Sequence, residues 1–375
     1  MRIRDIQAIG LRGATPPGGW SEELRPEYTV HTLVFVRTDE GLTGIGSVFT
    51  NADLVRAALG VLEPLYRGEE ALEPERVSEK LHQHTFWLGR GGGLTHAISG
   101  IDIALWDILG QATGQPVGRL LGGRYRDHVR PYASLLMDHP EPLAEHLRQI
   151  AARGFRAFKI GWGPFGRVSP ELDERIVRAA REAVGPDALL MVDAGGSDAF
   201  WPNGVKWALR TAQMLPSYDV AWFEEPLRPD ALEDYVLLRR QATLPIAGGE
   251  VLTRRQSFLP WLQGGAFDIV QPDVTKVGGI SEERRVGWMA DEHDIRFIPH
   301  GWNTAIGLAA DMHLASAFPR TDLVEYIDGS PYVDEIVAEP WRLDADGMLA
   351  IPNGPGLGIQ LDPDAIARYG DAPLP

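Results

Sequence analysis

The chain has 375 residues, 44% hydrophobic and 23% charged, which is enough for one large folded unit with a smaller one attached. Its formal net charge of −16 argues against nucleic acid or an anionic membrane as partner, and the absence of cysteine excludes disulfides, a thiol nucleophile and thiolate metal sites. No apolar run has the length of a signal peptide core or a membrane span, so we expect a cytoplasmic protein.

The first 125 residues predict a small α+β unit. Residues 29–48, TVHTLVFVRTDEGLTGIGSV, contain β-rich runs broken by turn residues, a pattern typical of an antiparallel meander. Residues 10–27 are rich in glycine and proline and predict a loop. A helix is predicted over residues 95–114, capped by Thr95, and its apolar residues cover most faces, so we expect it to be buried.

From residue 131 onward, short apolar strands alternate with polar-apolar helices. One helix is clear, because Ser169 and Pro170 form a start signal and Gly185 a stop signal. This alternation predicts an α/β fold, a parallel (β/α)8 barrel; a doubly wound sheet is the alternative, but the glycine fingerprint that it usually carries is missing. The predicted strands are RPYASLL, FRAFKIG, LLMVDAG, VAWFEEP, LPIAGGE, FDIVQPD, IRFIPH and LVEYID.

The sequence therefore predicts three units along the chain. Residues 1–125 form an α+β capping domain and residues 126–330 form the barrel that carries the catalytic groups. Residues 331–375 contain no further strand-helix unit, and we expect this C-terminal segment to pack back on the capping domain and complete it.

Ionisable residues stand at or near the ends of successive predicted strands, about one strand-helix unit apart. Because the carboxyl ends of barrel strands converge on one mouth, these distant residues are predicted to meet in one site. The residues are Asp193, Glu224, Glu250, Asp273 and His300, with Glu325 inside the last strand.

Three of these carboxylates, Asp193, Glu224 and Glu250, come from adjacent strands. In a buried site they would repel one another, and a hard divalent cation would neutralise that charge. All-oxygen ligation favours Mg²⁺. The alternative is that each carboxylate caps a helix or pairs with a local arginine.

The remaining groups suggest proton transfer. Asp273 and His300 are predicted to form a hydrogen-bonded dyad in which the aspartate fixes the imidazole tautomer, although a buried structural pair is the alternative. Lys159 enters the mouth if its strand face is inward, and otherwise extends along a helix. Glu325 is predicted to be a neutral acid that donates to an oxyanion; the alternative is a salt bridge to Lys159 or to an arginine.

Together these residues resemble the enolase superfamily, in its mandelate racemase-like acid-sugar dehydratase branch. The resemblance implies that Glu224, and not Glu225, is the metal ligand, and that the protein is a homo-oligomer. Two positions depart from the family pattern: Gly161 stands where a second lysine is common, and Gly195 where an asparagine is common. The motifs that carry the resemblance are IDIALWDILGQATGQPVGRLLGG, MVDAGG, WFEEPL, IAGGE, QPDVTKVGGIS, IPHGWN and VEYIDG.

The predicted activity is Mg²⁺-dependent removal of the α-proton of a sugar-acid carboxylate through an enediolate, followed by β-elimination of water to a 2-keto acid. Racemisation or epimerisation of a 2-hydroxy acid is the alternative, and Gly161 in place of a second lysine favours dehydration. The base is either His300 or Lys159. A barrel that binds metal and sugar acid without catalysis is the alternative of another class.

The substrate pocket is predicted to be capped by loops of the N-terminal unit and by the loop after the second barrel strand. A glycine- and proline-rich loop over a barrel mouth can exclude water from the site. The substrate is expected to be a small sugar acid, and the residues predicted to bind it are Trp20, Trp87, Arg90 and Trp162.

Overall fold

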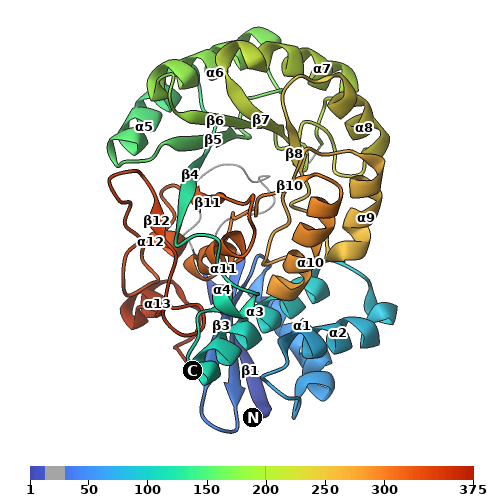
Figure 1. The fold of residues 1–375 in the computed structure, drawn as a ribbon, viewed down its shortest axis with the longest axis vertical. Coiled ribbons are helices and arrows are strands. Elements are labelled where there is room, and N and C mark those ends of the chain that lie inside the picture. Colours follow the sequence, from blue (N-terminus) through green and yellow to red (C-terminus); the bar gives the residue numbers. More distant parts are fainter. Residues whose placement is uncertain (13–29, 199) are drawn as a thin grey trace.

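The computed structural model describes residues 1–12, 30–198 and 200–375. Figure 1 shows a ring of strands with helices around its outside and, at one side, a smaller group of strands and helices that contains the N-terminus. Most of the loop predicted over residues 10–27, including Trp20, lies outside the described residues.

The ring is a parallel sheet of eight strands, which confirms the predicted α/β barrel class. Backbone pairing follows the order β10-β9-β8-β7-β6-β5-β4-β11, and between β10 and β11 the Thr321 hydroxyl donates to the carbonyl of Phe297 at 2.7 Å. All eight predicted strands are present. They are β4 (His128–Leu136), β5 (Ala157–Gly161), β6 (Leu189–Asp193), β7 (Val220–Glu224), β8 (Ile246–Gly248), β9 (Ile269–Val270), β10 (Arg296–Phe297) and β11 (Leu323–Ile327).

One helix follows each of the first seven barrel strands and lies outside the ring (Figure 1). The predicted signals of α6 are confirmed, because the Ser169 side chain accepts from the Leu172 backbone N–H and Gly185 ends the helix at φ 82°. The helices are α5 (Pro140–Ala152), α6 (Pro170–Val184), α7 (Val205–Met214), α8 (Leu232–Gln241), α9 (Arg254–Gly264), α10 (Gly279–Glu292) and α11 (Ala305–Ser316), and a 3-10 turn, Leu215–Tyr218, follows α7.

The smaller group is an antiparallel sheet, in the order β1-β2-β3, covered by helices. The long helix α3 is buried as expected, but it begins at Gly93, so Thr95 lies inside its first turn and does not cap it. The elements are β1 (Ile3–Leu11), β2 (His31–Thr38), β3 (Thr43–Val48), α1 (Ala52–Tyr66), α2 (Pro74–His84), α3 (Gly93–Thr113) and α4 (Val117–Leu120), with a 3-10 turn at Phe86–Leu88.

Two glycines let β3 lie directly on α3. A Cβ atom at Gly46 would stand 1.9 Å from the carbonyl oxygen of Gly100, and one at Gly44 would stand 2.1 Å from that of Ala104. Real Cβ atoms do not approach backbone oxygens so closely, so any side chain here would force the sheet and the helix apart.

We therefore expect Gly46→Ala to lower the free energy of unfolding by about 3 kcal/mol, the upper range for overpacking a core. The matched control is Gly60→Ala in α1, where an added Cβ meets nothing within 4 Å, and alanine should stabilise the helix slightly. Thermal and urea unfolding measure both. Equal midpoints for the two variants would contradict the close packing of β3 on α3.

The C-terminal segment contacts both parts of the molecule. Its strand β12 (Leu349–Ala350) pairs antiparallel with the start of β4, and Gly370 forms a bridge with Leu11 of β1. The segment also contains the short helices α12 (Pro331–Asp334) and α13 (Pro363–Tyr369). The division of the chain at residues 125 and 330 stays a prediction.

Asp107 of α3 joins the segment to the small sheet. Its buried carboxylate accepts from the backbone N–H of Ile45 at 3.0 Å and from that of Leu357 at 2.9 Å. Burial raises the pKa of Asp107 to about 6, against the opposing effect of these hydrogen bonds. Through the described ranges, no helix has both the length and the apolar character needed to cross a membrane.

Candidate active site

Side chains that point into the barrel form an apolar layer and, beyond it, a polar layer. Because side chains two positions apart on a strand share a face, moving two residues along most strands leads from the first layer to the second. The apolar layer consists of Tyr132, Ala157, Met191, Trp222, Ala247, Ile269, Ile298 and Leu323.

The polar layer contains most of the residues that the sequence predicted to be functional. On β8 the pattern is interrupted, and the acid stands three residues beyond Ala247 instead of two. The layer consists of Ser134, Lys159, Asp193, Glu224, Glu250, Gln271, His300 and Glu325, all of them buried.

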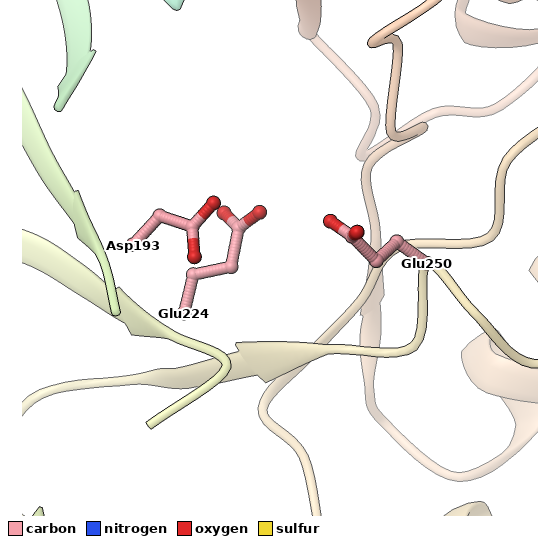
Figure 2. A group of neighbouring side chains, drawn as sticks. All are labelled: Asp193, Glu224 and Glu250. Carbon is pink, nitrogen blue, oxygen red and sulfur yellow. The ribbon is translucent and has the colours of Figure 1, made fainter. Parts of the chain in front are cut away.

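The carboxylates of Asp193, Glu224 and Glu250 face one another (Figure 2), and each offers an oxygen within 4.8 Å of the others. Asp193 and Glu224 end β6 and β7, and Glu250 lies just beyond β8. Burial, followed by repulsion from Glu224, raises the pKa of Asp193 well above its ordinary value. A buried group of three oxygen donors with excess negative charge fits a hard divalent cation.

Lys159 points inward and contacts this group. Its Nζ lies 2.6 Å from Glu224 Oε1, 2.9 Å from Glu325 Oε1 and 3.7 Å from Asp193 Oδ2. Burial alone would lower the pKa of Lys159, but Glu224 and Glu325 outweigh it and raise the pKa well above its ordinary value. Lys159 is therefore an ammonium that balances part of the carboxylate charge, and the alternative of an outward lysine is wrong.

Glu325 is an ion-pair partner of Lys159. Burial would raise the pKa of Glu325, but the charges of Lys159 and His300 outweigh it and bring the pKa below its ordinary value. One of its oxygens also accepts from the backbone N–H of Gly301 at 2.8 Å. The structure thus contains the salt bridge to Lys159 that was the alternative for Glu325, and the role of a neutral, donating acid stays a prediction.

Asp273 and His300 form the predicted hydrogen bond. His300 Nδ1 lies 2.8 Å from Asp273 Oδ2, and His300 Nε2 lies 3.0 Å from Glu250 Oε2. Burial would lower the pKa of His300, but Glu250, Glu325 and Asp273 outweigh it and raise the pKa well above its ordinary value. The bond to Asp273 favours a proton on Nδ1, while Nε2 faces the Glu250 carboxylate.

The two departures from the family pattern lie next to each other. Gly161, at the end of β5, is so close to Asp193 that an added Cβ would stand 3.1 Å from the aspartate Cβ. Trp162 follows in the left-handed region, at φ 62°. Its ring covers Gly195, where an added Cβ would lie 2.8 Å from the indole. The indole thus occupies the space that a side chain at position 195 would need.

A cavity of about 190 Å³ opens above this polar layer. Of the residues predicted to bind substrate, Trp162 lines it, whereas Trp87 is 99% exposed and Arg90 lies over the ring of Phe86. Neither Trp87 nor Arg90 is among the lining residues, Trp20 lies outside the described residues, and a substrate-binding role for these residues stays a prediction. The lining residues are Phe49, Ser134, Leu135, Leu136, Lys159, Gly161, Trp162, Asp193, Ser197, Glu250, Val251, Lys276, His300 and Trp302.

Sequence reasoning missed several residues of the site. Gln271 donates to Glu224 Oε2 at 2.8 Å, and its place two residues before Asp273 on the same strand face could have revealed it. Lys276 lines the cavity from the turn after β9, where no strand periodicity applies. Phe49 comes from the end of β3 in the small sheet, and no pattern in the barrel sequence predicts its contribution.

Comparison with known proteins agrees with this geometry. Residues 142–365 match the model of the enolase C-terminal domain-like family, and residues 27–122 match that of the mandelate racemase / muconate lactonizing enzyme N-terminal domain. The chain is 34% identical over 367 residues to the D-galactarolactone cycloisomerase of Agrobacterium fabrum, covering 93% of each chain. It is also 34% identical over 392 residues to the D-xylonate dehydratase of Haloferax volcanii, covering 98% of this chain and 94% of that one.

Solved structures lead to the same group. The 3,6-anhydro-D-galactonate cycloisomerase of Zobellia galactanivorans superposes with a TM-score of 0.87 at 29% identity, covering 99% of this chain and 100% of that one. The same family is indicated by both family models, by relatives that match over nearly the full length, and by the barrel with its small sheet domain. This chain is an enzyme of the enolase superfamily and belongs to its mandelate racemase / muconate lactonizing enzyme family.

Proposed function

We propose that the protein removes the α-proton of a sugar acid and then eliminates water to form a 2-keto acid. The observation that carries this proposal is the Asp273–His300 dyad, which faces the Asp193, Glu224 and Glu250 carboxylates across one cavity. Dehydratase relatives support the choice of substrate class, among them the D-xylonate and arabinonate dehydratases.

The three carboxylates would hold Mg²⁺, which supplies Lewis acidity to stabilise the negative charge that develops on the substrate carboxylate. His300 would take the α-proton at Nε2 when Glu250 serves as a metal ligand and no longer pairs with the imidazole, while Asp273 stays bonded to Nδ1. Lys159 keeps its ammonium beside the carboxylates and donates to the substrate carboxylate oxygen. Trp162 and Phe49 line the cavity and would add apolar surface beside the bound substrate.

Racemisation is disfavoured because it needs a second base on the face opposite His300. On the β5 side, Gly161 offers no side chain, and Lys159 is held by Glu224 and Glu325. A single imidazole base is sufficient for elimination, in which the proton and the leaving oxygen can depart on the same side.

A cycloisomerase is the second candidate, since the Agrobacterium relative and the Zobellia structure are both cycloisomerases. The same α-proton would be removed, but the leaving oxygen would belong to a ring and would stay attached to the product. The product would then have the mass of the substrate, whereas dehydration lowers the mass by one water.

The test is a screen of sugar acids, diacids, lactones and anhydro acids with Mg²⁺, read by mass spectrometry and by NMR in D₂O. We expect a 2-keto acid with loss of water from at least one open-chain acid. A 2-keto acid of unchanged mass would establish the cycloisomerase, and inversion without elimination the racemase. Binding of acids with no exchange at the α-carbon would overturn the proposal in favour of a non-catalytic barrel. The homo-oligomer stays a prediction that light scattering can test.

A further inference from the structure

Lys276 is a buried cation of the cavity that the predicted mechanism does not use. It lies three residues after Asp273, in the turn that joins β9 to α10, and its side chain is 7% exposed. Its Nζ is 3.8 Å from Asp273 Oδ2 and 4.4 Å from the centroid of the Phe49 ring. No residue in the described part of the chain accepts a hydrogen bond from this ammonium.

The neighbours of Lys276 leave its donors available. Asp273 Oδ2 is taken by His300 Nδ1 at 2.8 Å, and Asp273 Oδ1 accepts from the backbone N–H of Thr275 at 2.7 Å and from its hydroxyl. Phe49 offers the face of its ring, which attracts a cation but accepts no conventional hydrogen bond. A buried ammonium is costly without an acceptor, so Lys276 is suited to donate to an oxygen of a ligand bound in the cavity.

The position of Lys276 relates it to the proposed base. Lys276 Nζ and His300 Nδ1 both lie within 4 Å of the same Asp273 oxygen, so the ammonium and the imidazole are on one side of the cavity. Lys159 reaches the cavity from β5, beside the metal-binding carboxylates. A substrate with its carboxylate near those acids and its α-carbon at His300 would have its next carbon in the same cavity as Lys276.

We propose that Lys276 is a catalytic residue, the acid that protonates the departing β-oxygen; this inference rests on the proposed function. The α C–H bond breaks and its proton moves to His300 Nε2. The β C–O bond breaks, and its oxygen takes a proton from Lys276 and leaves as water. The electron pair of the C–H bond forms the C=C bond, and the pair of the C–O bond leaves with the oxygen. The resulting enol takes a proton at the β-carbon and releases the proton of its α-hydroxyl to solvent, which gives the 2-keto acid. Exchange with solvent returns both side chains to their starting states.

The test separates the two bond-breaking steps in Lys276→Met. In D₂O with Mg²⁺ and the best open-chain acid from the screen, we expect keto-acid formation to fall by about 10³-fold, within the usual range for losing a general acid. Exchange of the α-proton should persist within about tenfold, because His300 and the carboxylate group are intact. The drop should appear in kcat rather than in KM.

Two further measurements keep the test specific. Lys276→Arg preserves the positive charge but holds its proton too tightly to release it, so it should not restore elimination. An analogue with fluorine in place of the β-hydroxyl needs no acid to leave, so Lys276→Met should process it at close to the wild-type rate. Lys206→Met, at an exposed position of α7, is the matched control and should retain wild-type elimination and thermal midpoint.

The possible results are distinguishable. A wild-type ratio of elimination to exchange in Lys276→Met, or a rise in KM alone, overturns the assignment of Lys276 and leaves the proposed function in place. Elimination at the wild-type rate by Lys276→Arg would also overturn the assignment of Lys276 and leave the proposed function in place. If the wild-type enzyme shows neither exchange nor elimination with any acid of the screen, the proposed function fails and this assignment fails with it.

Discussion

Replacement of His300 by asparagine is expected to lower the rate of α-proton exchange by about 10³-fold or more, the effect of removing a general base. Asparagine can keep a hydrogen bond to Asp273, so the fold should be preserved while the basic nitrogen is lost. Elimination must fall in parallel, because no enolised substrate is formed. NMR in D₂O measures the exchange, and a keto-acid assay measures the elimination.

The control for this variant is His293→Asn. His293 is exposed just after α10, where its ring hydrogen-bonds the backbone carbonyl of Met289, so its loss should leave turnover unchanged. Titration calorimetry should show that His300→Asn still binds Mg²⁺. Turnover that survives in His300→Asn would move the role of base to Lys159, the other candidate from the sequence.

Removing the metal, or one of the carboxylates that would bind it, should lower turnover about as much as replacing His300. Chelation of the metal is expected to abolish turnover, and Asp193→Asn should bind Mg²⁺ much more weakly, because one of three carboxylate ligands becomes a neutral amide. The stability of the metal-free protein, in contrast, should rise in Asp193→Asn. Burial and Glu224 already raise the pKa of Asp193, so removal of its charge relieves repulsion in the metal-free protein.

Calorimetric melting tests this pair of effects without an activity assay. Wild-type protein should melt at a higher temperature when Mg²⁺ is added, since a ligand that binds the folded state stabilises it. Asp193→Asn should start from a higher metal-free midpoint and gain little from Mg²⁺, and Asp230→Asn, an exposed control, should behave like wild type. A large Mg²⁺ shift in Asp193→Asn would show that the ion binds elsewhere.

The sequence predicted the barrel and the polar layer because both follow from periodicity. Strands alternate with helices, and in a parallel barrel each strand end is directed to the same mouth, so Asp193, Glu224 and His300 could be brought together without coordinates. The same reasoning stops where the strand ends. Lys276 reaches the cavity through the conformation of a turn, which no two-residue alternation describes.

Charge states and long-range contacts were harder to predict for a physical reason. The charge of Glu325 depends on which cation is within ion-pair distance, and Lys159 at 2.9 Å lowers the pKa of this carboxyl. Likewise, the sequence shows only that Gly195 replaces the asparagine common in the family. The structure supplies the reason, because the indole of Trp162 occupies the space that a side chain at position 195 would need. Trp87 and Arg90 were predicted from their place in loops expected to cover the barrel mouth. Both are exposed, because the sequence does not determine where a loop directs its side chains.

The return of the C-terminal segment to β4 and β1 has a consequence for protein synthesis. The partners of Val129, Asp107 and Leu11 are Leu349, Leu357 and Gly370, which leave the ribosome long after the elements that they complete. Until then, the nascent chain exposes open strand edges, which are prone to pair with other chains. Both sheets are therefore completed only after the last part of the chain has been synthesised.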